Sequence, residues 1–223
     1  MTYARTKTGI FKTRPNRFIA VVEVDGTDTV CHVKNTGRCK ELLVPGCTVV
    51  LEAAANPARK TPYDVIAVYK GERLINMDSQ APNQVAEEYL RHRFPEATIR
   101  REVTYGESRF DFHLTNQGEE WWIEVKGCTL EMDNIGYFPD APTDRGVKHL
   151  RHLTQAVQEG YKAAVLFIIQ MEGVTAIRPN DTTHPAFGET LRRAAQNGVE
   201  IWAVDCQVTP DTLVYKNPVT VEL

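Results

Sequence analysis

The sequence predicts an α/β protein, α+β overall, in which a β-rich N-terminal module precedes a mixed-sheet α/β domain. Short strand-like runs separated by turns fill residues 9–75. From residue 83 onwards the expected order of elements is α-β-β-β-α-β-α-β. The wholly apolar run at 163–169 is typical of a buried parallel strand. We therefore expect two domains, residues 1–78 and residues 79–223.

The N-terminal module has the strand spacing of a small barrel. Strand-like runs are expected at 18–24, 29–33, 47–51 and 63–69, with turns between them. A run of about five short strands over some 70 residues suits an OB-like β-barrel. Such barrels bind single-stranded nucleic acid through backbone charge and through stacking of bases on aromatic side chains. Phe11, Phe18 and Tyr63 are candidate stacking faces, although Phe18 is expected in the core.

Charge is distributed unevenly along the chain. Residues 1–60 contain ten Lys and Arg against five Asp and Glu, whereas the remainder contains 16 basic and 24 acidic residues. A basic module beside an acidic domain suggests phosphate binding next to a metal-holding part. The candidate nucleic-acid-binding residues are Arg14, Arg17, Lys34, Arg38, Arg59 and Lys60. The alternative is a chance clustering of charge on a solvated surface.

The second domain is expected to begin after a linker at 78–83. Its predicted elements are a helix at 84–93 capped by Asn83, a strand at 99–105, a hairpin at 108–126, an irregular segment at 127–142, a helix at 144–159 capped by Asp144 or Thr143, the strand at 163–169, a helix at 185–197, a strand at 199–204 and a tail strand near Val214. In the second helix, His149 and His152 are expected to be solvated, and a metal-ligating pair is the alternative.

The hairpin at Ser108–Lys126 contains the candidate catalytic residues. With the loop centred between Gln117 and Gly118, opposed residues have numbers that sum to 235, so Asp111 faces Glu124. Opposed Cβ atoms lie roughly 4.5–5.5 Å apart, and two carboxylates at that distance repel each other unless a cation lies between them. Mg²⁺ is such a cation, since it takes one or two carboxylates together with substrate phosphates. Lys126 points the same way as Glu124 and is expected to orient a water molecule or a phosphate oxygen.

An Asp, a turn and then Glu-x-Lys resembles the pattern of the PD-(D/E)XK nuclease superfamily. The triplet Glu124-Val125-Lys126 alone is also compatible with an exposed strand face that has no catalytic role. The order of elements from residue 83 independently matches the restriction-endonuclease-like fold. We therefore expect Asp111, Glu124 and Lys126 to be catalytic, with Asp111 and Glu124 holding the metal.

Longer stretches closely resemble the sugar fermentation stimulation protein family. They are NRF at 16–18, NTGR at 35–38, PG at 45–46, PN at 82–83, EVTYGESRFDF at 102–112, IEVKGCTL at 123–130, YFPDAPTDRGVKHL at 137–150 and the closing NPVTVEL. The resemblance implies an OB-like domain, a PD-(D/E)XK-like domain and DNA binding. It also implies that Glu88 joins the metal shell, and it places Asp140 and Arg145 in a stretch whose position suggests the rim of the site.

The expected function is that of a DNA-binding protein that hydrolyses phosphodiester bonds with Mg²⁺ or Mn²⁺. The alternative is a non-catalytic DNA-binding transcriptional regulator of sugar (maltose) metabolism. RNA is an alternative polymer, because an OB-like platform accepts either. For the oligomeric state, a homodimer is the alternative to a monomer.

The compartment is expected to be the cytoplasm, with no membrane partner. No run approaches the roughly 20 apolar residues that a membrane helix needs, and the first residues lack an apolar signal region. The five cysteines form no C-x-x-C pair and are odd in number, so reduced thiols are expected rather than disulfides or a zinc site.

Overall fold

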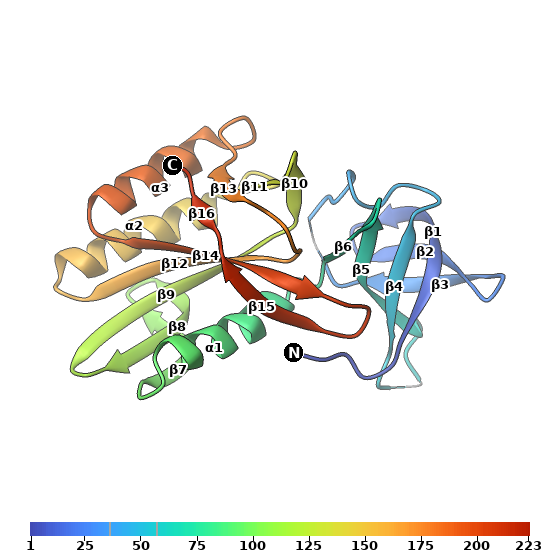
Figure 1. Ribbon diagram of the computed structural model, residues 1–223, viewed down its shortest axis with the longest axis horizontal. Helices are drawn as coiled ribbons and strands as arrows, with labels where there is room; N and C mark the ends of the chain where they lie inside the picture. The colour runs from blue at the N-terminus through green and yellow to red at the C-terminus, as the bar shows by residue number, and fades with distance from the viewer. Residues whose placement is uncertain (36, 57) are drawn as a thin grey trace.

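The computed structural model describes residues 1–35, 37–56 and 58–223, so Thr36 of the NTGR stretch lies outside the described residues. The chain forms two lobes side by side, a β-barrel and a larger α/β domain (Figure 1). This arrangement confirms the fold class predicted from the sequence.

The barrel consists of six strands whose inward side chains form its core. They are β1 (Thr6–Asn16), β2 (Ile19–Val24), β3 (Thr27–Val33), β4 (Thr48–Ala53), β5 (Tyr63–Lys70) and β6 (Arg73–Asn76). The sheet order is β3-β2-β1-β4-β5-β6, and a parallel pairing of β3 with β5 closes it. Alternating residues such as Ala20, Val22 and Val24 are buried, which gives the period of two typical of a sheet with one covered face. The barrel is OB-like, as predicted.

The α/β domain is built on a six-stranded mixed sheet in the order β15-β14-β12-β9-β8-β7. Its elements are α1 (Ala81–Arg93), β7 (Thr98–Tyr105), β8 (Ser108–Asn116), β9 (Glu119–Cys128), α2 (Asp144–Gln158), β12 (Lys162–Ile169), α3 (Pro185–Gln196), β14 (Glu200–Val208) and β15 (Leu213–Pro218). Strand β12 lies in the middle and pairs in parallel with β9 and β14, as its apolar sequence predicts. Helix α1 covers one face of the sheet, and α2 with α3 covers the other (Figure 1). No helix in the described part of the chain is long and apolar enough to cross a membrane.

The expectation of an irregular segment at 127–142 is wrong. This segment contains a hairpin of β10 (Leu130–Met132) and β11 (Ile135–Phe138), and β11 joins β13 (Ala176–Pro179) and β16 (Thr220–Val221) in a small sheet. Asp133 and Asn134 form the turn with φ values of 52° and 63°. Asp and Asn tolerate this left-handed conformation, so the Asp-Asn pair was a turn signal between two short apolar runs.

The segment at 78–83 joins the lobes, but it is not an exposed linker. Asp78 is 2% exposed, and α1 begins already at Ala81, so Asn83 lies inside the helix and is not its cap. Gln170 of the α/β domain donates to Asn76 Oδ1 (2.9 Å) and to the Asp78 carbonyl (3.1 Å). Buried polar groups that are all hydrogen-bonded fix the geometry around them, so this joint is rigid.

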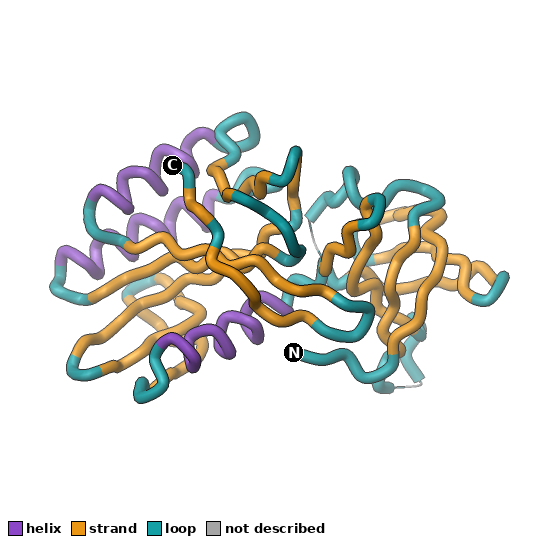
Figure 2. The backbone as a smooth tube through the Cα atoms, viewed as in Figure 1, coloured by secondary structure: helices purple, strands orange, loops and turns teal. Residues whose placement is uncertain are grey.

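The amino terminus makes a second connection between the lobes. The first residues run from the barrel to the edge of the α/β domain (Figure 2), where the Met1 ammonium donates to the Leu213 carbonyl at 2.8 Å and Thr2 bridges Thr212. The Tyr3 hydroxyl lies within hydrogen-bonding distance of Asp78 Oδ2 at 3.3 Å and accepts from Asn76 at 2.8 Å. The amino terminus therefore ties the two lobes together in addition to the segment at 78–83.

Candidate active site at the domain junction

A cavity of about 570 Å³ lies between the barrel and the α/β domain. Asn35 and Gly37 line it from the barrel side, and residues of β9, α1 and the loop before α2 line it from the other side. Its lining includes five of the predicted site residues, Asp111, Glu124, Lys126, Asp140 and Arg145. The structure thus brings together residues that are up to 34 positions apart in the sequence.

The register of the β8–β9 hairpin is the one predicted. The pairs Phe112–Ile123 and Leu114–Trp121 both sum to 235. Gln117 and Gly118 form the turn, with φ values of 52° and 85° that match a type I′ hairpin. The prediction that the hairpin is centred between these two residues is confirmed.

The ladder ends one pair before the two carboxylates. Its last pair is Phe112–Ile123, so Asp111 and Glu124 are not a ladder pair. Phe110 packs with Trp122 beneath α2, whereas Phe112 packs in the cluster beneath α1. Side chains two apart on a regular strand share a face, so β8 is irregular at Asp111. The Asp111 carboxylate therefore reaches across to the backbone of β9.

Two donors hold the Asp111 carboxylate in place. The Val125 amide donates to Oδ2 at 2.7 Å, and Asn83 Nδ2 donates to Oδ1 at 2.8 Å. Burial and the negative charge of Glu124 raise the pKa of Asp111, while the two hydrogen bonds act in the opposite direction. The expectation that Asn83 caps the helix is wrong, because Asn83 lies inside α1 and its side chain makes this contact.

Glu124 is the most enclosed of the predicted site residues, at 4% exposure. Its Oε1 contacts Lys126 Nζ and His149 Nδ1, each at 2.5 Å. Burial alone would raise the pKa of Glu124, but the hydrogen bond from His149 and the charge of Lys126 outweigh it, so the pKa is lowered. The other oxygen, Oε2, is buried and has no hydrogen-bond partner among the described residues. Buried polar atoms are nearly always paired, so an unpaired oxygen at this position indicates a place for a ligand.

The expectation that His149 is solvated is wrong. Its side chain is buried against Glu124, and Arg145 Nε lies 3.4 Å from its Nε2. The tautomer that carries hydrogen on Nδ1 satisfies both contacts. His149 precedes Leu153 by four residues and Ala156 by seven, so helical spacing already placed it on the buried stripe of α2. His152 lies outside the cavity and contacts Ser108 Oγ at 2.7 Å.

Glu88 is not brought to the site. Its carboxylate pairs with the Met1 ammonium at 2.9 Å, and it does not line the cavity. Position 88 lies roughly 140° around the helix from position 83, which faces Asp111, so the two point in different directions. In the described ranges, no group of three or more His, Cys, Asp or Glu side chains is placed to hold a metal. Asp111 and Glu124 are therefore the acidic pair on which a metal would depend.

Asp140 lies on the loop that closes the cavity against the barrel. A Cβ atom added to Gly37 would come within 2.7 Å of Asp140 Oδ2 and 2.8 Å of Asn35 Oδ1. This close approach explains why glycine occupies position 37. The loop after β11 and the barrel are thus in contact at the rim of the cavity.

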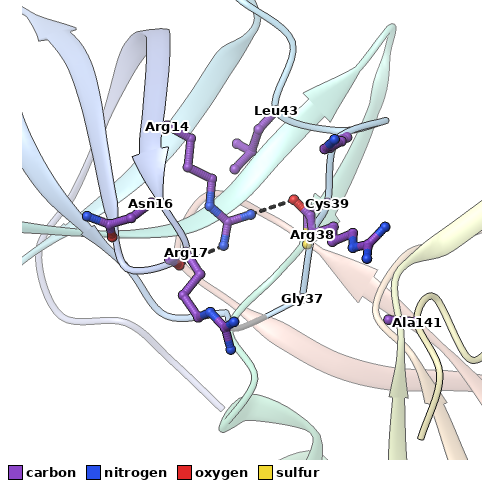
Figure 3. A pocket seen from close by; sticks show the side chains of 9 residues that line it. Arg14, Asn16, Arg17, Gly37, Arg38, Cys39, Leu43 and Ala141 are labelled. Atoms are coloured by element: carbon purple, nitrogen blue, oxygen red, sulfur yellow. Dashed lines mark hydrogen bonds between the residues drawn. The ribbon is translucent and has the colours of Figure 1, made fainter.

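Three of the predicted basic residues gather in a second cavity of about 450 Å³. Arg14, Arg17 and Arg38 line it together with Lys40 (Figure 3). Figure 3 shows the Arg14 guanidinium between Arg17 and Arg38, with Ala141 of the α/β domain facing them. Arg14 donates to the carbonyls of Arg38 (2.6 Å), Arg17 (2.7 Å) and Asn35 (2.7 Å).

The other three basic candidates lie outside both cavities. Arg59 pairs with Asp64 through two contacts of 2.6 Å and 3.0 Å. Lys34 binds Asp78 at 3.1 Å and Glu52 at 3.4 Å, and Lys60 is exposed. Arg59 and Lys34 therefore stabilise the barrel and its joint with the α/β domain.

The three aromatic candidates for base stacking differ from the prediction in their exposure. Phe18 is 49% exposed, so its assignment to the core is wrong. Phe11 is 2% exposed and belongs to the barrel core, which excludes it as a stacking face. Tyr63 is half-buried near Lys7.

Known proteins share this two-domain arrangement. A family described as "SfsA N-terminal OB domain" matches residues 13–77, and "Sugar fermentation stimulation protein RE domain" matches residues 80–212. The sugar fermentation stimulation protein homologue of Desulfitobacterium hafniense (strain DCB-2) is 53% identical over 225 residues, covering 100% of this chain and 99% of that protein. The homologue of Clostridium beijerinckii is 51% identical and covers all of both chains.

A solved structure shows the same fold. The structure of Pyrococcus furiosus SfsA in complex with Ca²⁺ superimposes with a TM-score of 0.89 at 26% identity, covering 100% of this chain and 98% of that chain. The two family matches together span most of the sequence. The chain therefore belongs to the sugar fermentation stimulation protein family.

Proposed function

We propose that this protein is a divalent-metal-dependent nuclease that binds DNA and hydrolyses its phosphodiester bonds. The observation that carries the proposal is the buried Glu124 Oε2, which has no hydrogen-bond partner among the described residues and belongs to a side chain that lines the same cavity as Asp111. Two carboxylates with a free oxygen suit a hard cation such as Mg²⁺ or Mn²⁺. The Ca²⁺ named for the Pyrococcus furiosus relative is a cation with the same preference for oxygen ligands.

The residues of this chain fit such an ion. Asp111 and Glu124 would hold it, and it would supply positive charge to stabilise the developing charge on a phosphate. The Val125 amide and Asn83 orient Asp111, and His149 orients Glu124, so neither carboxylate has to rearrange. A fixed outer shell of this kind is typical of functional metal sites.

Lys126 has a different task. Its Nζ is bound to Glu124 and its side chain is 17% exposed to the cavity. An ammonium at this position donates hydrogen bonds to a phosphate oxygen or orients an attacking water. It also offsets part of the negative charge that would otherwise repel a phosphate from the site.

DNA binding is assigned to the basic cavity beside the site. Arg17 and Arg38 provide cationic groups that bind phosphates without reading the sequence. One feature favours the alternative of a non-catalytic DNA-binding regulator. Among the described residues, no third His, Cys, Asp or Glu side chain is placed with Asp111 and Glu124 to hold a metal.

Incubation of the pure protein with single-stranded, duplex and branched DNA separates the two functions. We expect cleavage that requires Mg²⁺ or Mn²⁺ and is lost in Asp111→Asn and Glu124→Gln. Glu88→Gln is the matched control, because this acidic residue of the same domain lies outside the cavity. DNA binding without cleavage under every metal condition would contradict the nuclease and support the regulator.

A further inference from the structure

The basic cavity and the carboxylate cavity are contiguous. Gly37 and Ala141 line both of them, one from the barrel and one from the α/β domain. A nucleic-acid strand bound in the basic cavity would therefore reach Asp111 and Glu124 by way of these two residues.

Hydrogen bonds hold the barrel loops beside Gly37 in place. Arg14 binds three backbone carbonyls, those of Arg17, Asn35 and Arg38, and so holds two loops of the barrel together. The Asn35 side chain donates to the Met77 carbonyl at 2.9 Å and accepts from the Gly37 amide at 2.7 Å. Arg14 is thus a positioning residue.

Arg17 and Arg38 are left to meet a ligand. Both are exposed and line the basic cavity, and within the described ranges neither forms an ion pair with an acidic side chain. Guanidinium groups in such positions bind phosphates with two parallel hydrogen bonds. Two phosphates of one strand are therefore the ligands that this cavity suits.

Phe18 is adjacent in the chain to the residues that line the basic cavity. It follows Arg17, and its amide donates to Asn16 Oδ1 at 2.9 Å, so the turn that carries it also lines the basic cavity. A phenyl ring that is half exposed offers a face on which a base stacks. Bases in a duplex are already stacked within the helix, so this face is useful only to an unpaired strand.

The burial of Glu124 also favours an unpaired strand as the ligand. Glu124 is buried, and the rim around it is narrowed where Gly37 meets Asp140. The hydrogen bonds from Gln170 to Asn76 and Asp78 oppose a separation of the lobes that would admit a wider molecule. A flexible single strand can follow this path, whereas a duplex presents its phosphates on the outside of a stiff cylinder.

We propose that the protein takes an unpaired DNA strand, which stacks a base on Phe18, binds Arg17 and Arg38 through its phosphates, and passes between Gly37 and Ala141 to the carboxylates. The proposal rests on the proposed function only for the fate of the strand at its end. Binding itself is independent of the metal.

Fluorescence anisotropy in a chelating buffer tests this path. The probe is a labelled single strand of about 12 nucleotides, within the site size of one OB fold, and the competitors are the unlabelled strand and its blunt duplex. We expect the single strand to compete at least tenfold better. Arg17→Gln/Arg38→Gln should weaken binding at least tenfold and reduce the salt slope by about 1.4.

Two controls separate the path from general effects. Arg5→Gln/Lys12→Gln removes the same charge from one exposed and one partly exposed position of the same barrel and should leave binding within twofold of the wild type. Phe18→Ala should weaken binding roughly fivefold or more, and Phe18→Tyr, which keeps a ring, should restore it. Circular dichroism of each variant checks that the fold is retained.

The outcomes distinguish this inference from the nuclease. Arginine-dependent single-strand binding without any cleavage would support the path and contradict the nuclease. Equal competition by duplex and single strand would overturn the path, whether or not the protein cleaves DNA. Equal effects of the two double variants would overturn it as well.

Discussion

His149 Nδ1 and Glu124 Oε1 lie 2.5 Å apart, with both side chains almost completely buried. This contact connects α2 to β9 and fixes one oxygen of Glu124, whereas the other oxygen, Oε2, is buried without a hydrogen-bond partner among the described residues. A carboxylate held in this way is preorganised for a cation, because its orientation is set before the ion arrives.

Loss of this contact should therefore weaken metal binding. We expect His149→Ala to reduce the affinity for Mn²⁺ roughly 10- to 100-fold, as is typical when an outer-shell partner is removed. Isothermal titration calorimetry measures the effect. His152→Ala is the matched control from the same helix, because its contact with Ser108 lies outside the cavity. Wild-type Mn²⁺ affinity in His149→Ala would show that the histidine does not orient Glu124.

Arg14 and Arg17 should differ in what their substitution changes. Arg14→Ala removes three hydrogen bonds to backbone carbonyls, so it should lower the free energy of unfolding by about 1–3 kcal/mol. Arg17→Gln alters an exposed side chain and should change stability by less than about 0.5 kcal/mol while weakening DNA binding. Urea denaturation and anisotropy measure the two effects. A stable Arg14→Ala variant would contradict the positioning role.

Glu131 should make the joint between the lobes sensitive to acid. Its carboxylate pairs with Lys70 (2.8 Å) and Arg73 (3.0 Å) of the barrel. Burial would raise its pKa, but the hydrogen bond from Lys70 and the Asn134 amide lower it. A carboxylate whose pKa is depressed by folding stabilises the folded state above its unfolded pKa, and this contribution is lost as the pH falls through the folded pKa.

Glu131→Gln should therefore lower the free energy of unfolding by about 1–2 kcal/mol at pH 7. This value is smaller than for a fully buried ion pair, because Lys70 and Arg73 are partly exposed. The difference from the wild type should shrink as the pH falls below the ordinary glutamate pKa. Urea denaturation across that range measures it. Glu189→Gln is the control, since its pair with Arg193 is largely exposed. A difference that is constant with pH would rule out the charge as the cause.

Gly127 should tolerate no side chain. A Cβ atom there would lie 2.6 Å from Gln170 Oε1 and 2.7 Å from Pro82 Cγ, where α1 meets β9. We expect Gly127→Ala to destabilise the protein by about 1–3 kcal/mol through overpacking. Gly136→Ala is the matched control, because its nearest contact would be an ordinary 3.4 Å. Thermal unfolding of the two variants compares them, and equal midpoints would contradict the packing argument.

The sequence predicted those features that depend on local pattern. Alternation and the turn at Gln117-Gly118 were sufficient for the β8–β9 register, and the apolar run at 163–169 for the central strand. The irregularity at Asp111 depends on β7, where Glu102 has a φ of 58° and the flanking pairs are Arg101–Phe112 and Val103–Phe110. Contact with a neighbouring strand decides such a feature, and the hairpin alone does not contain it.

The candidate site could likewise be predicted only where local strand pattern determines it. Asp111, Glu124 and Lys126 lie in one hairpin, so strand geometry placed them together. His149 and Asn83 come from helices on opposite faces of the sheet, and their contacts follow only from tertiary packing. The resemblance implies a metal-shell position for Glu88, but its helical angle from Asn83 turns it away from the site.

The central claim is that Asp111 and Glu124 together hold a divalent ion. A crystal soaked in Mn²⁺ and measured near the manganese absorption edge tests it most directly. We expect an anomalous peak in the cavity about 2.0–2.3 Å from a carboxylate oxygen of each residue, with Glu124 Oε2 among the ligands. A crystal that binds Mn²⁺ elsewhere, or shows no peak between these two side chains, would contradict it.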